Sequence, residues 1–223
     1  MKPFWHEEAI IWYRRAARYA GYFDALADIL MQWLTPGETV SDIGCGPGLL
    51  ADALMVRGLS VRGYDICDIA IEDWNRRRTA DGKTSCGQVA DVFTRNPNAF
   101  AADAVLAGHF GRKATDFDFL LRIPAKQYLF IKNMKRSETV RGRARATADE
   151  VAAHLHARGL DYESVPVGLA FHQPLKDEAE LQRFCTFYGI KQPTVHRTAG
   201  KYPLLVEKKK RMTVLCARRK EAL

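Results

Sequence analysis

Residues 40–50 read Val-Ser-Asp-Ile-Gly-Cys-Gly-Pro-Gly-Leu-Leu, the most informative stretch of the chain. A short apolar run ends at Ile43, three glycines follow at alternate positions, and residues 49–57 have a helical period that closes at Gly58. The glycines therefore lie between a predicted strand and a predicted helix. Glycine lets the backbone turn sharply and lets a ligand approach without a Cβ in the way. The free N–H groups at the start of the helix favour a ligand in the adjoining crevice.

Strand-like and helical segments alternate along the rest of the chain. Expected strands cover 60–65, 85–90, 104–107, 128–132, 162–171 and 212–217, and expected helices cover 69–77, 115–122, 148–158 and 177–188. Thr147 and Glu150 predict a capping box for the helix over 148–158. Residues 7–34 are typical of one or two helices with a break at Gly21. This alternation predicts a parallel sheet covered by helices on both faces.

The composition is that of a soluble globular protein, with 223 residues of which 47% are apolar and 27% charged. No linker divides the chain, so we expect a single domain over 1–223. The longest run without a charged residue, 164–175, is shorter than the roughly 20 residues of a membrane span, and no signal peptide is expected. Five scattered cysteines without a Cys-x-x-Cys pair favour the reducing cytoplasm over a disulfide or zinc scaffold.

The net charge of +8 is concentrated in two segments. Residues 132–145 hold six basic side chains against one acidic, and residues 201–220 hold eight against one. Localised basic charge indicates an anionic partner, either RNA or a phosphorylated or carboxylated small molecule. The alternative interpretation is that these segments are solvated loops and an edge strand whose lysines prevent it from pairing with other chains.

Three acidic residues narrow the class of ligand. Asp42 precedes the first glycine by two positions, where a carboxylate would repel a dinucleotide's pyrophosphate but attract a ligand with an ammonium and a sulfonium, such as S-adenosylmethionine (SAM). Asp65 closes the second expected strand, where an acid can accept both ribose hydroxyls. Asp91, with Val92, follows the third strand and can receive an adenine amino group.

On these residues the chain resembles the class I SAM-dependent methyltransferases. Asp42, Gly44, Gly46 and Gly48 match the family's first motif. Asp65 matches its ribose-binding acid, and the pair Asp91 and Val92 matches its adenine-binding turn. The resemblance is clear over about 39–133 and looser beyond, where 212–217 would be the antiparallel seventh strand. It implies a doubly wound, seven-stranded, mostly parallel α/β sheet with an antiparallel last strand and N-terminal helices. It also adds Cys45, Ile66 and Ala107 to the expected cofactor contacts, Cys45 as small filler and not as a nucleophile.

The resemblance implies an acceptor pocket at the ends of strands four and five and in the late insertion. An imidazole titrates in the useful range, so His109 is the first candidate for a base or orienting group and His172 the second; each can equally be a packed or capping histidine. We expect residues 1–35 to form a helical lid and 172–210 an insertion between the last two strands. The expected pocket wall is mostly aromatic and uncharged, which suits an apolar or aromatic acceptor, and consists of Trp5, Trp12, His109, Phe110, Phe171 and His172.

Several methyltransferase signatures are missing from the sequence. There is no Asp/Asn-Pro-Pro-aromatic motif, no Pro-Cys or Thr-Cys nucleophile pair and no acidic cluster for magnesium, so no metal is expected. The sequence therefore predicts a cytoplasmic SAM-dependent methyltransferase with a small-molecule acceptor. The alternatives are an RNA methyltransferase using the basic segments 141–145 and 208–211, a SAM-binding protein without methyl transfer, and an NAD-linked oxidoreductase. The sequence does not determine the oligomeric state.

Overall fold

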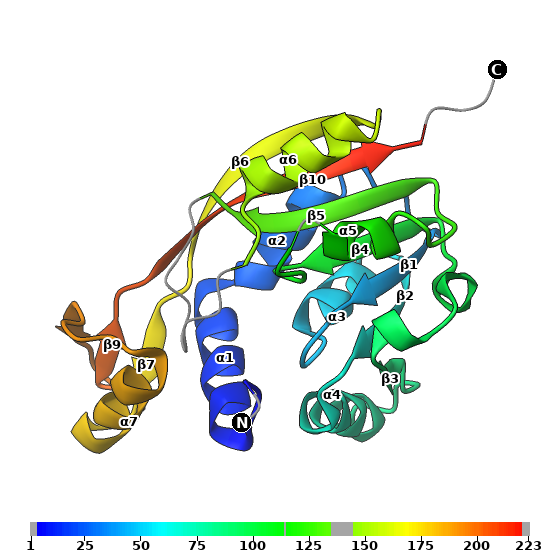
Figure 1. Ribbon diagram of the computed structural model, residues 1–223. Coiled ribbons are helices and arrows are strands. Elements are labelled where there is room, and N and C mark those ends of the chain that lie inside the picture. Colours follow the sequence, from blue (N-terminus) through cyan, green and yellow to red (C-terminus); the bar gives the residue numbers. More distant parts are fainter. Residues whose placement is uncertain (1–3, 114, 135–144, 220–223) are drawn as a thin grey trace.

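The computed structural model describes residues 4–113, 115–134 and 145–219 (Figure 1). Two helices open the chain, α1 (Glu7–Ala20) and α2 (Tyr22–Leu30). Gly21 separates them in a left-handed conformation, with φ 58°, which ends α1 and lets the chain turn into α2. The predicted break at Gly21 is confirmed.

Seven strands form the main sheet. They are β1 (Thr39–Ile43), β2 (Ser60–Asp65), β3 (Gly87–Val89), β4 (Ala104–Gly108), β5 (Gln127–Asn133), β6 (Asp161–Ala170) and β10 (Lys209–Arg218). Their order is β3-β2-β1-β4-β5-β10-β6, and β10 is antiparallel to both of its neighbours. The predicted doubly wound sheet with an antiparallel last strand is confirmed.

The strand order reverses at β1, which pairs in parallel with both β2 and β4. In open α/β sheets, ligands bind outside the carboxyl ends of the strands at such a switch point. The glycine loop that follows Ile43 lies at this position.

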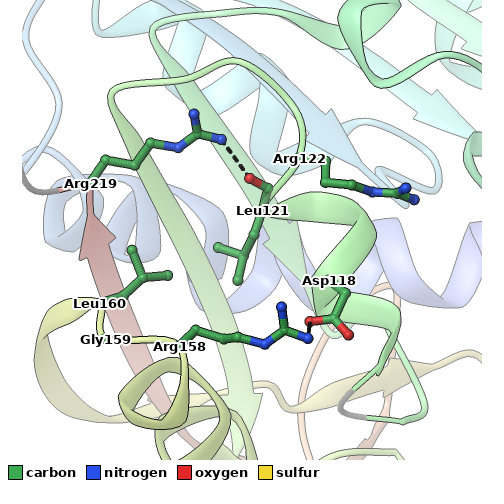
Figure 2. A pocket seen from close by; sticks show the side chains of 7 residues that line it. All are labelled: Asp118, Leu121, Arg122, Arg158, Gly159, Leu160 and Arg219. Carbon is green, nitrogen blue, oxygen red and sulfur yellow. Dashed lines mark hydrogen bonds and ion pairs between the residues drawn. The ribbon is translucent and has the colours of Figure 1, made fainter.

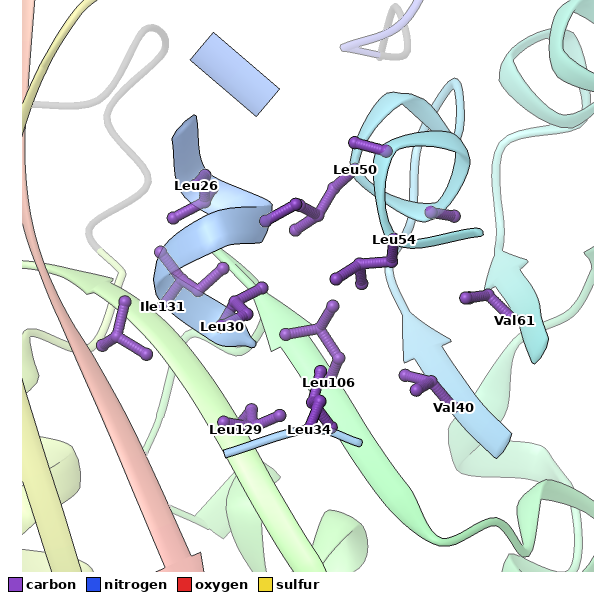
Figure 3. Close-up of a cluster of buried hydrophobic side chains, with 14 of the residues drawn as sticks. Leu26, Leu30, Leu34, Val40, Leu50, Leu54, Val61, Leu106, Leu129 and Ile131 are labelled. Atoms are coloured by element: carbon purple, nitrogen blue, oxygen red, sulfur yellow. The ribbon is translucent and has the colours of Figure 1, made fainter. Parts of the chain in front are cut away.

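Helices cover both faces of the sheet: α3 (Leu49–Val56) and α4 (Asp68–Ala80) pack with α2 on one face, and α5 (Thr115–Leu120) and α6 (Ala148–Ala157) on the other. Side chains alternate between the two faces along each strand. In β5, Leu129 and Ile131 enter the first core, shown in Figure 3, while Tyr128 and Phe130 enter the second. Each such fully buried side chain contributes about 1.5–3 kcal/mol of transfer free energy.

The start of α6 is fixed by its side chains. The Glu150 backbone N–H donates to Thr147 Oγ1 at 3.3 Å, and the Thr147 backbone N–H donates to Glu150 Oε2 at 2.8 Å. This is the capping box that the sequence predicts.

A second, three-stranded sheet lies between β6 and β10 in the chain and stands beside α1 (Figure 1). It consists of β7 (Gln173–Leu175), β9 (Leu204–Val206) and β8 (Val195–Arg197), with α7 (Glu178–Tyr188) packed against it. The helix over 177–188 was predicted, whereas β7, β8 and β9 are not among the strands that the sequence predicts. Strands of three residues are too short to show an alternating pattern.

The insertion is joined to α1 by buried polar contacts. Both carboxylate oxygens of Glu180 accept from the Arg15 guanidinium, at 3.0 and 2.9 Å, and Oε1 also accepts from the Trp12 indole N–H at 3.1 Å. The N-terminal helix and the insertion therefore form one packed unit beside the main sheet. Among the described residues, no helix is long and apolar enough to cross a bilayer.

Candidate functional site

The glycine loop after β1 turns through three left-handed residues, with φ of 75° at Gly44, 54° at Gly46 and 68° at Gly48. The backbone N–H groups of Gly44 and Cys45 both donate to the carbonyl of Tyr64, at 2.7 and 3.2 Å. These bonds fasten the loop to the end of β2, so the loop and the expected ribose-binding acid are held together.

Gly48 has a packing role. A Cβ on Gly48 would overlap the indole of Trp74 in α4, and a Cβ on Gly63 or Gly87 would lie 2.5 or 2.8 Å from the same indole. Trp74 is fully buried, and its N–H donates to Asp52 Oδ1 at 3.0 Å. Three glycines from different segments thus accommodate one tryptophan, and the α-carbon of Gly48 faces this ring.

Gly44 and Gly46 are covered by aromatic rings from elsewhere in the chain. A Cβ on Gly44 would lie 2.6 Å from Phe110, in the loop after β4, and a Cβ on Gly46 would lie 2.9 Å from Trp5. Both rings stand where the sequence predicts that a ligand approaches the loop.

Asp65 ties the end of β2 to this loop. One carboxylate oxygen accepts from the backbone N–H of Gly46 and the other from that of Cys67, each at 2.8 Å. Burial raises the pKa of Asp65, while these two N–H groups oppose the shift by stabilising the carboxylate. Each oxygen retains a lone pair, so the group can still accept from a ligand's hydroxyls.

Asp42 lies in β1 with 3% of its surface exposed. Burial, and then the negative charge of Asp65, raise the pKa of Asp42 to about 7. Two carboxylates therefore lie close enough to interact at the glycine loop, where a nearby positive charge would stabilise both.

The other expected cofactor contacts differ in exposure. Ile66 is 70% exposed just after β2, and the Asp91 carboxylate accepts from the Phe93 N–H at 3.1 Å, starting a short 3-10 turn (Val92–Thr94). Val92 and Ala107 are buried in the core beneath α5 and α6, so neither side chain is on the surface of the crevice. Cys45 packs at the edge of the other core.

His109, directly after β4, is the non-glycine residue with a positive φ in the described chain, at 53°. Its backbone N–H donates to Ile131 at 2.8 Å. Its ring Nε2 is buried without a hydrogen-bond partner within the described structure. Burial, followed by the charges of Lys210, Arg145 and Lys132, holds the pKa of His109 well below its usual range, so the imidazole is neutral. Strained backbone and orphaned polar atoms are typical of functional sites.

Two cations hold the loop that contains His109. The ammonium of Lys132, 1% exposed in β5, donates to the carbonyls of Phe110 and Gly111, and the guanidinium of Arg145 donates to the carbonyl of His109. Burial, and then the charge of Arg145, lower the pKa of Lys132 to about 7. These two side chains therefore position His109 through the backbone carbonyls of its loop.

His172 and Trp12 have other partners. His172 Nδ1 accepts from the backbone N–H of Lys208 at 3.2 Å, which fixes the chain just before β10. Trp12 is 1% exposed and packs edge-to-face on Phe184 of α7, with ring centroids 5.4 Å apart. Trp12 belongs to the core of the insertion, so it is not on the surface of a pocket as the sequence indicated.

A cationic cluster at the start of β10 was not predicted as part of the site. The ammonium of Lys210 lies 3.8 Å from the ring centroid of Phe171, 4.7 Å from that of Tyr22 and 5.1 Å from that of Tyr13. Lys208 lies 4.8 Å from the ring of Tyr188. Burial, and then the charges of Lys208 and Arg145, lower the pKa of Lys210 to about 7. The side chains of the basic run 208–211 therefore alternate in direction. Lys208 and Lys210 lie against aromatic rings, while Lys209 and Arg211 are exposed to solvent.

A hollow at the opposite edge of the sheet is a separate feature (Figure 2). It lies where the end of β10 meets the start of β5, far along the strands from the glycine loop. Its arginines are engaged, with Arg219 donating to the Leu121 carbonyl at 2.6 Å and Arg158 paired with Asp118 at 2.7 Å. The described residues contain no cluster of three or more His, Cys, Asp or Glu arranged to hold a metal.

No family model and no curated protein matches the chain by sequence. Solved structures do match it. Magnesium protoporphyrin IX methyltransferase from Synechocystis PCC 6803, with bound SAH, has 13% identity and TM-score 0.59 over 96% of this chain and 89% of its own. The proposed RNA methyltransferase PH1948 from Pyrococcus horikoshii has 16% identity and TM-score 0.58 over 99% and 94%. The [4+2]-cyclase SpnF has 14% identity and TM-score 0.57 over 89% and 82%. The chain therefore has the class I SAM-dependent methyltransferase fold.

Proposed function

We propose that the chain uses this fold as a SAM-dependent methyltransferase with a small-molecule acceptor. The observation that carries the proposal is the buried carboxylate of Asp42 together with the partly buried carboxylate of Asp65 at the glycine loop. The carboxylate of Asp42, two positions before the first glycine, is unfavourable for a pyrophosphate and favourable for a ligand with positive charge at its sulfur and amino groups. The NAD-linked alternative is disfavoured on the same ground.

The residues present fit SAM. Asp42 would attract the cationic methionine part, Asp65 would accept from the ribose hydroxyls, and the exposed Ile66 with Asp91 would border the adenine. Bound SAM supplies an electrophilic methyl group on its sulfonium. The protein mainly has to align the acceptor with this group and exclude water.

The remaining groups around the crevice have roles on the acceptor side. The neutral imidazole of His109 carries a free ring nitrogen that would accept the acceptor's proton or orient its oxygen. Trp5 and Phe110 lie over the glycines and would exclude water, which supports a lid role for residues 1–35. His172 stays a second candidate for this role, with its other ring nitrogen, because its Nδ1 already accepts from the backbone N–H of Lys208.

Two alternatives each have an observation in their favour. PH1948 is described as a proposed RNA methyltransferase, and the basic segments would suit RNA. However, Lys208 and Lys210 lie against aromatic rings instead of extending into solvent, and residues 141–144 lie outside the described structure. SpnF, a cyclase of the same fold, illustrates that the fold alone does not fix the reaction. The five unpaired cysteines support a reducing compartment such as the cytoplasm.

Calorimetric titration of the purified protein with SAM, SAH and NADH tests the cofactor. We expect binding of SAM and SAH and none of NADH; binding of NADH alone would refute the proposal. Transfer of labelled methyl groups from SAM is then measured with a small-metabolite extract and with total RNA, each at low and high salt. Label is expected in the small molecules. Label in RNA that falls steeply with salt would establish the RNA alternative, because each phosphate contact releases counterions.

A further inference from the structure

The cationic cluster around Lys210 lies close enough to His109 and Arg145 for their charges to interact. β10 is antiparallel to β5, so its first residues lie next to the carboxyl end of β5, on the same sheet edge as His109. Ring contacts connect the glycine loop to the rings around Lys210. Trp5 over Gly46 packs on Tyr13 with ring centroids 5.0 Å apart, and Tyr13 packs on Phe171 at 5.4 Å.

Lys210 has aromatic partners but no acidic one. Three rings face its ammonium, and their negative faces favour the charged form. Lys208 and Arg145 oppose that form through like charge. Among the residues that the structure describes, no carboxylate forms an ion pair with Lys210 or Lys208. A cluster of partly buried cations without a counter-charge would be stabilised by binding an anion.

We propose that the acceptor is a small molecule bearing a carboxylate or phenolate, and that Lys210, assisted by Arg145, binds this anionic group beside His109. The inference rests on the proposed function, since it concerns the acceptor of that reaction. The lowered pKa of Lys210 agrees with it, because a bound anion would restore the charged ammonium. The protein would then use carboxylates for the methyl donor and cations for the acceptor.

An anion-exchange fractionation tests the class of acceptor without knowledge of its identity. A small-metabolite extract is separated at about pH 11, where phenols as well as carboxylic acids are ionised, into a fraction retained by the resin and an unretained fraction. Each is incubated with the protein and labelled SAM. We expect label in products formed from the retained fraction. Label formed from the unretained fraction alone would overturn the inference.

Substitution of Lys210 tests the residue itself, with benzoate as the anionic probe and benzamide as its neutral counterpart. Binding to the SAH-loaded protein is measured by calorimetry. Lys210→Met keeps an unbranched side chain among the rings, and should weaken benzoate binding roughly tenfold to a hundredfold while leaving benzamide unchanged. Lys210→Arg should restore most of the affinity for benzoate.

Lys209→Met is the matched control, because Lys209 is the next residue of β10 and its side chain is 66% exposed beside Glu207. We expect this variant to bind benzoate as the wild type does. Equal affinity of the wild type for benzoate and benzamide, or loss of turnover in Lys210→Met with unchanged benzoate affinity, would overturn the inference. Binding of SAH to the wild type separates the two claims. If SAH does not bind, the proposed function fails, and if SAH binds while benzoate is not distinguished from benzamide, only the anionic acceptor fails.

Discussion

The indole of Trp5 lies over Gly46, so close that a Cβ on the glycine would be 2.9 Å from ring atom Cζ2. The ring is held there by an edge-to-face contact with Tyr13, at 5.0 Å between centroids, and by Phe4 at 4.9 Å. A ligand that approaches the glycine must displace this side chain, which links the start of the chain to occupancy of the crevice.

Removal of Trp5 should therefore strengthen SAM binding. Trp5→Ala is expected to lower the Kd about threefold to tenfold, because the binding-competent state no longer requires displacement of the ring. Calorimetry measures the effect, and Tyr19→Ala is the control, since Tyr19 is an aromatic residue of α1 that is 54% exposed. Weaker binding in Trp5→Ala would instead identify Trp5 as part of the wall that contacts the ligand.

Asp65→Ala should weaken SAM binding by about 1–3 kcal/mol, roughly tenfold to a hundredfold, through loss of charge-assisted hydrogen bonds to the ribose. The same change frees the N–H groups of Gly46 and Cys67, so thermal unfolding is measured alongside calorimetry. Asp81→Ala removes a 66% exposed carboxylate and should leave affinity unchanged. An unaltered Kd in a folded Asp65→Ala protein would remove Asp65 from the site.

Gly48→Ala should destabilise the protein whether or not ligand is present. The new Cβ would overlap the buried Trp74, so the expected loss in unfolding free energy is about 3 kcal/mol or more, from overpacking added to left-handed strain. Gly82→Ala is a closely matched control, because Gly82 has the same φ of 68° and open space around it. That variant should lose only about 1–2 kcal/mol. Similar losses in the two variants, measured by chemical denaturation, would show that α4 shifts to admit the new methyl group.

The backbone strain at His109 can be separated from its chemistry by two substitutions. His109→Ala and His109→Gly both remove the imidazole, and each should reduce methyl transfer about a hundredfold or more if the ring acts as base. His109→Gly should be the more stable of the two by about 1–2 kcal/mol, because glycine adopts φ 53° without penalty. Unchanged turnover in both variants would leave His109 with a packing role only.

The affinity for SAM should depend on pH through Asp42. With a pKa near 7 in the free protein, Asp42 is neutral below that pH and anionic above it. A cationic ligand binds the anionic form, so affinity is expected to rise about tenfold from about pH 6 to about pH 8. Asp42→Asn should remove most of this rise. Lys210→Met, which eliminates a second group that titrates near 7, should retain it. A rise that persists in Asp42→Asn and disappears in Lys210→Met would assign the pH dependence to the lysine.

Local features of the sequence were sufficient to predict the alternation of strands and helices in the main sheet and the glycine loop after β1. The glycines after β1, the break at Gly21 and the capping box of Thr147 each depend on residues within a few positions of one another. Such short-range signals are visible in the order of residues alone.

Features that depend on distant segments were not predicted. Residues 173–175 pair with 204–206, and neither run is long enough to show a period. The rings around Lys210 come from α1, α2 and the residue after β6, so the lysine was interpreted as part of a solvated basic run. A better signal was the alternation along β10, which places every second lysine toward the sheet's helical cover.

The contact between α1 and the insertion bears on the order in which the protein folds. Trp12 and Arg15 are among the early residues of the chain, yet both bond to Glu180, which is 165 or more positions later. During synthesis the contact of α1 with the insertion must therefore wait for nearly the whole chain, and contacts of such long sequence separation form slowly. Trp5 reaches Gly46 from just before the same helix, next to Phe4, which contacts Phe187 of α7, so we expect the cover of Gly46 to become stable only after the insertion has folded. A nascent or partly folded chain would present its glycine loop uncovered.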